Sequence, residues 1–431
     1  MHQRKRVLLL ALLALVMAAA RASVSRKVTV NPSENGVVEA NVSEASEGQR
    51  VTLTVFPAEG YRLSGIYLLL EPISPPENSE SGTLTRYALP AIGGSVDAIP
   101  TTENTYSFLM PAHDVEISGR FCKVLAVEGI NVTTANNAQL LEEKAEVVVT
   151  VCDEARREVT LEQIRLQNVL QNGVTVHIPP SVKDAEGNAY NITAISPYAF
   201  LGQENVSDVW LPDTEQALVI GKNAFLLEIP SESNRRMPTL HVPLSLLDDY
   251  ALMRTLEDLY EESRIHSSVE VPNRYWTFSC GVDVYVPEEV VFYTLSECNG
   301  YEVKITRQDS MSNKRSGKNV RVIKANNGVL LDGMRARKYE IIACPSDDRP
   351  SGMIPPLHNA MSYEGINLLE PVVEARHFDS GEYYVLSHNE FRPIFQEEDS
   401  AKVPACKAVL HLKGKATRSL VIHKNSKEEE M

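Results

Sequence analysis

The stretch that decides the fold is TAISPYAFLGQENVSDVWLP, residues 193–212. A short apolar run reaches Ala199-Phe200, a polar loop follows, and a second apolar run ends at Leu211-Pro212. Further along the chain, LVIGKNAF brings another apolar run to Ala224-Phe225, 25 residues after the first Ala-Phe pair. Two such phrases in similar register indicate a repeat, and a repeat would set the fold.

The spacing of these phrases predicts how the repeat packs. A period of 25 residues lies within the range of about 20–29 residues typical of leucine-rich repeats. Each turn of such a coil lays one short strand beside the previous one, and a Phe at a fixed position forms a ladder inside. Proline ends the hydrogen bonding of each strand. We therefore expect Phe200 and Phe225 in the core and not at a binding surface. The corresponding Pro marks are Ile178-Pro179, Leu211-Pro212 and Val242-Pro243.

Residues 123–270 resemble the BspA-type leucine-rich repeat of Bacteroides-type surface proteins. The phrases that carry the resemblance are IPPSVKDAEGNAYNITAISPYAF, LPDTEQALVIGKNAF and LHVPLSLLDDY. The array is short, with two to three turns, so flanking regions must cover its ends. Leu, Tyr and Met at helical spacing over residues 244–263 predict a helical cap at its C-terminal end.

Residues 23–122 read as a small β domain. Alternation in RVTLTVF, residues 50–56, places Val51, Leu53 and Val55 on one face of a strand. Residues 71–104 are rich in Pro, Ser, Gly and Glu and predict a long loop or a decorated hairpin. Turn signals stand at Asn35-Gly36, Glu47-Gly48 and Glu59-Gly60.

This N-terminal region resembles the divergent internalin B-repeat-like modules of bacterial surface proteins. The matching phrases are Gly36-Val37, Gly48 to Tyr61, and Tyr106 to Phe121. The family's usual Trp after the Gly-Tyr strand is missing, and Ile66-Tyr67 stands there instead. Such modules serve as spacers or weak adhesion units, so the resemblance implies no chemistry.

Residues 271–431 predict a C-terminal antiparallel β domain that ends in a charged tail, KNSKEEEM. Strand-like phrases such as YWTFSCGVDVYVP and NVRVIKANNGVLLDG are parted by turns, with loops expected at 307–319 and 345–362. The phrases ANNGVLLDG, YYVLS and VPACKA resemble the β-rich domain that often follows such repeats in Bacteroides-type surface proteins. The fold expected for the whole chain is therefore mainly β in three parts.

The first 22 residues have the features of an export signal. A basic segment, MHQRKR, precedes the apolar run VLLLALLALVMAAA, and cleavage is expected after Ala22. Cleavage would remove four basic residues and change the net charge from −15 to −19. A chain this acidic is repelled by nucleic acid and by anionic lipid. We expect an exported protein, secreted or on the surface of a Gram-negative bacterium, with no membrane-spanning segment in the mature chain.

Six cysteines follow the leader, and their spacing leaves their state open. Cys122 could pair with Cys152, or Cys280 with Cys298, although isolated buried thiols fit equally well. Zinc-ligand spacing is absent. The six are Cys122, Cys152, Cys280, Cys298, Cys344 and Cys406.

No motif of catalysis or metal binding stands out, so no catalytic, cofactor-binding or metal-ligating residue is assigned. The nucleophile motif G-x-S-x-G and the zinc motif H-E-x-x-H are both missing. Ser387-His388 and Cys344 are isolated, and core or surface roles fit them better than catalysis. No zinc-motif partner accompanies His358, His377, His388 or His411.

These features favour a non-catalytic, adhesin-like binding protein without a cofactor, whose partners are host matrix or cell-surface proteins. A glycan-binding accessory protein is one alternative, because exposed aromatic rings can stack on sugars. A hydrolase with its site in the C-terminal domain is another, since any acidic chain offers pairs of carboxylates. The aromatic candidates for glycan stacking are Trp210, Trp276, Tyr383 and Tyr384.

Overall fold

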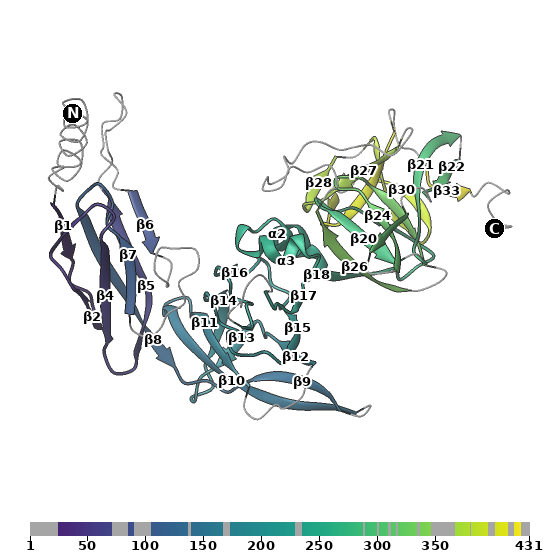
Figure 1. Cartoon of the computed structure of the whole chain (residues 1–431). Helices are drawn as coiled ribbons and strands as arrows, with labels where there is room; N and C mark the ends of the chain where they lie inside the picture. The colour runs from purple at the N-terminus through teal and green to yellow at the C-terminus, as the bar shows by residue number, and fades with distance from the viewer. Residues whose placement is uncertain are drawn as a thin grey trace, which may run out of the picture. The chain divides into compact units, whose positions relative to one another are not determined.

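A computed structural model shows a mainly β protein with a few short helical turns (Figure 1). The predicted export signal and the charged tail lie outside the described residues, as do most of residues 71–104 and nearly all of the predicted loop at 345–362. The residues described are 25–70, 85–89, 105–136, 139–166, 173–228, 235–287, 289–299, 301–308, 312–315, 318–333, 337–345, 367–379, 381–394, 401–412 and 418–423.

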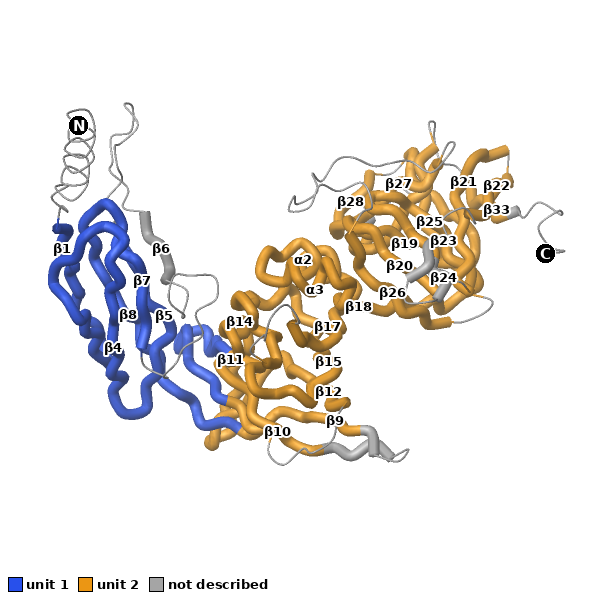
Figure 2. Tube along the Cα trace, in the orientation of Figure 1, with its two compact units in different colours: residues 1–127, 148–160 blue, residues 128–147, 161–431 orange. Residues whose placement is uncertain are grey.

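The chain forms two compact units, coloured separately in Figure 2. Unit 1 comprises Met1–Val127 and Val148–Thr160, and unit 2 comprises Glu128–Val147 and Leu161–Met431. In the described residues no helix is long and apolar enough to cross a membrane.

Unit 1 contains two groups of paired strands. In the first, β4 pairs in antiparallel fashion with β2 and β7; in the second, β5 pairs with β6 and β8, and β1 runs parallel to β8. The strands are β1 (Ser25–Val30), β2 (Gly36–Ala40), β3 (Glu44–Ser46), β4 (Arg50–Pro57), β5 (Tyr61–Leu70), β6 (Thr85–Leu89), β7 (Thr105–Leu109) and β8 (Val115–Leu125). Strand β6 lies within the stretch predicted to be a loop or decorated hairpin, and it is the part that the structure describes.

The core of unit 1 confirms the alternation read from β4. Val51, Leu53 and Val55 are fully buried, whereas the intervening threonines remain partly exposed. The predicted turns are confirmed as well, because Asn35, Gly48 and Gly60 all have positive φ angles, at 61°, 77° and 77°. Glycine tolerates this conformation because it has no Cβ, and asparagine is among the residues that adopt it most often.

The first part of unit 2 is built on parallel strands. Strands β12, β15, β17 and β18 pair in that order, each parallel to the next, and β14 pairs in parallel with β16 (Figure 1). The strands here are β9 (Ile130–Asn136), β10 (Gln139–Asp153), β11 (Glu158–Arg165), β12 (Val174–His177), β13 (Ser181–Lys183), β14 (Ala189–Ile195), β15 (Val206–Trp210), β16 (Val219–Ile220), β17 (Thr239–His241) and β18 (Ile265–Glu270), of which β10 and β11 contribute residues to both units.

The two Ala-Phe phrases meet in the core of unit 2. The rings of Phe200 and Phe225 are both buried, and their centroids lie 5.2 Å apart. The backbone N–H of Phe200 donates to the carbonyl of Ala224 at 3.0 Å. The prediction that these residues belong to the core is confirmed.

Helical turns follow β17 where the cap was predicted. They are η1 (Leu244–Leu246), α2 (Leu247–Ala251), η2 (Arg254–Leu256) and α3 (Glu257–Glu261). Each turn is short, so its stability must come from packing and not from helix propensity. Leu247, Tyr250, Leu259 and Tyr260 supply that packing because all four are buried.

The strands after residue 271 pair mostly in antiparallel fashion, with one parallel pair, β22 with β33. Strand β26 pairs with β18, so this part continues the strand pairing of the preceding region. The strands are β19 (Tyr275–Phe278), β20 (Asp283–Pro287), β21 (Val291–Asn299), β22 (Glu302–Arg307), β23 (Ser312–Arg315), β24 (Lys318–Ile323), β25 (Val329–Asp332), β26 (Lys338–Cys344), β27 (Leu369–Val372), β28 (Arg376–Phe378), β29 (Tyr383–Ser387), β30 (Glu390–Pro393), β31 (Ala401–Val403), β32 (Lys407–His411) and β33 (Leu420–His423).

The predicted loop at 307–319 is wrong in part, because β23 lies inside it. This strand pairs with β24 in register from Ser312↔Arg321 to Arg315↔Lys318. Its residues are Ser, Asn, Lys and Arg, which give no apolar alternation to read. Backbone pairing with β24 defines the strand, and side-chain patterns do not report such pairing.

Candidate functional site

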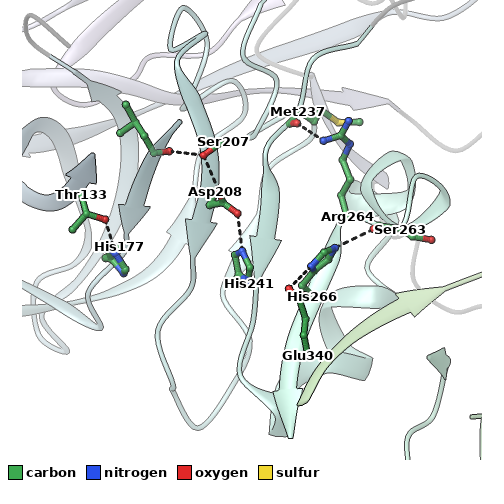
Figure 3. Close-up of polar contacts among 11 residues, drawn as sticks. Thr133, His177, Ser207, Asp208, Met237, His241, Ser263, Arg264, His266 and Glu340 are labelled. Carbon is green, nitrogen blue, oxygen red and sulfur yellow. Dashed lines mark hydrogen bonds and ion pairs between the residues drawn. The ribbon is translucent and has the colours of Figure 1, made fainter. Parts of the chain in front are cut away.

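Four ring-bearing side chains form a row across the parallel strands of unit 2. They are His177, Trp210, His241 and His266, here called the aromatic row. Figure 3 shows its three histidines. Strand register sets the row, since His177 pairs with Trp210, Trp210 with His241, and His241 with His266. Side chains at paired positions of neighbouring strands point to the same face of a sheet.

The rings of the row are in contact. Trp210 stacks on His241 with centroids 4.3 Å apart and planes within 5°, and on its other side it faces His177 at 6.1 Å. His241 meets His266 edge to face, with centroids at 5.6 Å. Trp210 is 42% exposed, so the row presents a partly accessible strip on the sheet.

Carboxylates flank two of the histidines. Asp208, two residues before Trp210 on β15, places Oδ1 2.8 Å from Nε2 of His241. Its other oxygen, Oδ2, accepts a hydrogen bond from the Ser207 hydroxyl at 2.6 Å. Asp208 therefore fixes the orientation of the His241 ring from the neighbouring strand.

His266 is held on both sides. Its Nδ1 lies 2.9 Å from Oε1 of Glu340 on β26, and its Nε2 lies 3.3 Å from the carbonyl oxygen of Ser263 (Figure 3). Glu340 has a lowered pKa, first because of its hydrogen bond to His266 and further because of the nearby His266 and His241 rings. At neutral pH the carboxyl of Glu340 is therefore ionised.

Three of these side chains have the chemistry of metal ligands. One donor atom each from His241, His266 and Glu340 lies within 4.8 Å of the other two. Both histidines are mostly buried, with side chains 15% and 17% exposed, whereas Glu340 is 56% exposed. The cluster therefore lies at the edge of the row and is open to solvent through Glu340.

A second feature of unit 2 is a cavity of about 610 Å³, here called the acidic cavity. Its lining includes four carboxylates, Glu215, Asp248, Asp249 and Glu374. Burial raises the pKa of Asp248 to about 6, although backbone N–H groups partly offset this effect. Oδ2 of Asp248 accepts the N–H of Gly281 at 2.7 Å, while Oδ1 is buried without a hydrogen-bond partner among the described residues.

The aromatic candidates for glycan stacking each contact a neighbouring side chain or are buried. Trp210 lies between two histidines, Lys407 Nζ sits 2.7 Å from the ring centroid of Trp276, and Tyr383 stacks on His411 at 4.6 Å. Tyr384 is 6% exposed. Tyr384 is therefore closed to a sugar, and Trp210, Trp276 and Tyr383 each have a neighbour on at least one face.

The other residues singled out in the sequence stay apart from both features. Ser387 ends β29 and His388 follows it in the turn before β30, with Oγ and Nδ1 3.0 Å apart. Within the described residues no carboxylate contacts His388, so the pair lacks the orienting acid of a catalytic triad. His411 lies 3.4 Å from both Glu370 and Glu382, and His358 lies outside the described residues.

No disulfide joins any two of the six cysteines, all of which lie in described residues. Neither of the two pairings considered from the sequence, Cys122 with Cys152 and Cys280 with Cys298, is formed. The thiol of Cys280 instead contacts that of Cys406, and this hydrogen bond together with complete burial raises the pKa of Cys280. Cys406 also donates to the carbonyl of Leu244 at 3.1 Å.

The sequence carries a signal for three members of the aromatic row. The residues His177, Trp210 and His241 stand directly before Ile178-Pro179, Leu211-Pro212 and Val242-Pro243, the marks that align the repeat. Because the marks align, these three residues occupy equivalent positions of the repeat, which predicts that they lie side by side. His266 and Glu340 have no such signal, because the ligand cluster spans intervals of 25 and 74 residues.

Comparison with known proteins gives one match, to a family model described as the divergent InlB B-repeat domain, over residues 26–98. The match supports a bacterial surface repeat module in this part of the chain, as predicted. No curated protein matches the chain. No solved structure matches it either.

Proposed function

We propose that this chain is an exported, non-catalytic binding protein of a bacterial surface, and that the aromatic row contacts its protein partner. The observation that carries the proposal is the row itself, in which ordered histidine rings flank Trp210, whose side chain is 42% exposed. Rings held by stacking lose little freedom on binding, and Trp is enriched among the residues that dominate protein interfaces. The repeat-module match at 26–98 is consistent with a place at the bacterial surface.

We further propose that residues 123–270 are a short repeat of the BspA type. Three features support this assignment: the parallel pairing of β12, β15, β17 and β18, the contact between Phe200 and Phe225, and the helical turns after β17. Partners of the host-matrix or cell-surface class fit this assignment. A glycan ligand is less favoured, because Tyr384 is buried and Trp210 has a histidine ring on each side, which leaves its edge and not its face to a partner.

The test is binding of residues 23–431 to an array of matrix proteins, mucins and polysaccharides. We expect saturable binding to a protein that weakens at least tenfold on Trp210→Ala. Phe56→Ala is the matched control, because Phe56 is an exposed aromatic residue on β4 of unit 1. If Phe56→Ala loses binding and Trp210→Ala keeps it, the partner-binding surface is in unit 1 and the proposal is wrong. Binding to glycans and to no protein would also refute the proposal.

The acidic cavity favours one second candidate, a hydrolase that uses carboxylates as acid and base. Asp248 would hold a proton near pH 6 and donate it, while an ionised neighbour acts as the base. The candidate predicts release of reducing ends from a polysaccharide, abolished by Asp248→Asn. No release from a broad panel of substrates at pH 5–7 would eliminate it.

A further inference from the structure

We propose that His241, His266 and Glu340 form a binding site for a divalent transition-metal ion, with zinc as the expected occupant. The three residues come from β17, β18 and β26, which are adjacent in the strand pairing. Two imidazoles with one carboxylate are a donor set that zinc accepts, and water can fill the fourth position. The site goes beyond the proposed function and would stand whether or not the aromatic row binds a protein.

The contacts of His266 leave one of its nitrogens facing Glu340. The Ser263 carbonyl can only accept, so Nε2 of His266, 3.3 Å away, donates its hydrogen to it. The other nitrogen, Nδ1, lies 2.9 Å from Oε1 of Glu340. The two groups are therefore side by side, where one metal ion can bind both.

The hydrogen bond of His241 likewise leaves a nitrogen for a metal. Nε2 lies 2.8 Å from the Asp208 carboxylate, and in the tautomer that donates this hydrogen bond the lone pair is on Nδ1. A carboxylate on the far nitrogen of a ligating histidine fixes the ring and raises its basicity, which is the usual outer-shell arrangement of zinc sites. The Ser263 carbonyl has the same role for His266.

The distances are within reach of coordination. Tetrahedral zinc with bonds of about 2.0–2.1 Å places its ligand atoms about 3.3 Å apart. Nδ1 of His266 and Oε1 of Glu340 are already 2.9 Å apart, and all three donors lie within 4.8 Å of one another. The largest approach needed to reach tetrahedral spacing is therefore about 1.5 Å. Glu340 is the exposed ligand, and its side chain can move without disturbing the core.

The test removes metal from residues 23–431 with a chelator, adds zinc, and clears unbound zinc by gel filtration. The zinc that stays bound is then measured. We expect one zinc ion per chain by elemental analysis. Glu340→Gln and His266→Ala should each weaken zinc binding at least tenfold in calorimetric titration. Asp208→Asn, which alters the carboxylate that orients His241, should weaken zinc binding by about 10–100-fold.

His177→Ala is the matched control, because His177 belongs to the aromatic row but lies outside the ligand cluster. It should bind zinc as the unchanged chain does. Glu340→Gln alters a half-exposed side chain, so its fold should survive, and thermal melts verify this. Zinc binding that persists in a His241→Ala/His266→Ala variant, or no binding by the unchanged chain, would overturn the proposal. Loss of partner binding in Trp210→Ala with zinc binding intact would separate the two sites.

Discussion

At the scale of single residues, Asp248 should make the stability of the protein depend on pH. Its pKa is about 6 in the folded chain, whereas an unfolded aspartate titrates near 4. Between these values the folded state binds more protons, so stability falls as the pH rises from about 4 to about 6 and stays lower above that. The difference corresponds to about 3 kcal/mol in the free energy of unfolding.

Asp248→Asn tests this expectation, because asparagine retains an acceptor for the Gly281 N–H and cannot ionise. The free energy of unfolding of the variant minus that of the unchanged chain should rise by up to about 3 kcal/mol as the pH increases from 4 to 7.5. Denaturant unfolding at several pH values measures the gain. Asp249→Asn is the control, since Asp249 lines the same cavity and its pKa is raised less. Parallel stability profiles for Asp248→Asn and the unchanged chain would contradict the assignment.

At the scale of elements, the short helices depend on two buried tyrosines. The Tyr250 hydroxyl on α2 accepts the backbone N–H of Leu218 at 2.9 Å, and the Tyr260 hydroxyl on α3 donates to the Cys344 carbonyl at 2.8 Å. Burial raises the pKa of Tyr250 to about 12, so it stays neutral throughout the physiological range. Helices of five residues each have little stability of their own.

Tyr250→Phe should therefore cost about 1–3 kcal/mol, because it leaves the buried N–H of Leu218 without its acceptor. Tyr260→Phe is the matched change and should cost less stability. It removes a hydrogen-bond donor from the Cys344 carbonyl, and a carbonyl that loses one donor costs less than a buried N–H without an acceptor. Chemical denaturation of both variants gives the comparison. An equal or larger loss in Tyr260→Phe would show that the two contacts do not differ as described.

The elements also show what the sequence could reveal. Val51, Leu53 and Val55 were predictable because alternation along one strand needs only local information. Phe200 and Phe225 were predictable because a repeat brings equivalent positions together. The cluster of His241, His266 and Glu340 was not, since Glu340 reaches it through antiparallel pairing of β18 with β26, 74 residues away. The pairing of distant strands carries no signature in one sequence.

At the scale of the whole molecule, the two units have separate cores. The buried residues that cluster around Val51, Leu53 and Val55 all lie between Val28 and Phe121. Phe200 and Phe225 belong to unit 2. Two cores that share no residues should unfold in two steps, because each step disrupts one set of contacts.

Leu53→Ala and Phe200→Ala together test this separation. Leu53→Ala should destabilise unit 1 by about 2–5 kcal/mol, and Phe200→Ala should destabilise unit 2 by about 3–5 kcal/mol. Each change should lower the melting temperature of one calorimetric transition and leave the other in place. The zinc site lies wholly in unit 2, so added zinc should raise the transition that Phe200→Ala lowers. A single transition shifted by both variants would mean that the units unfold as one.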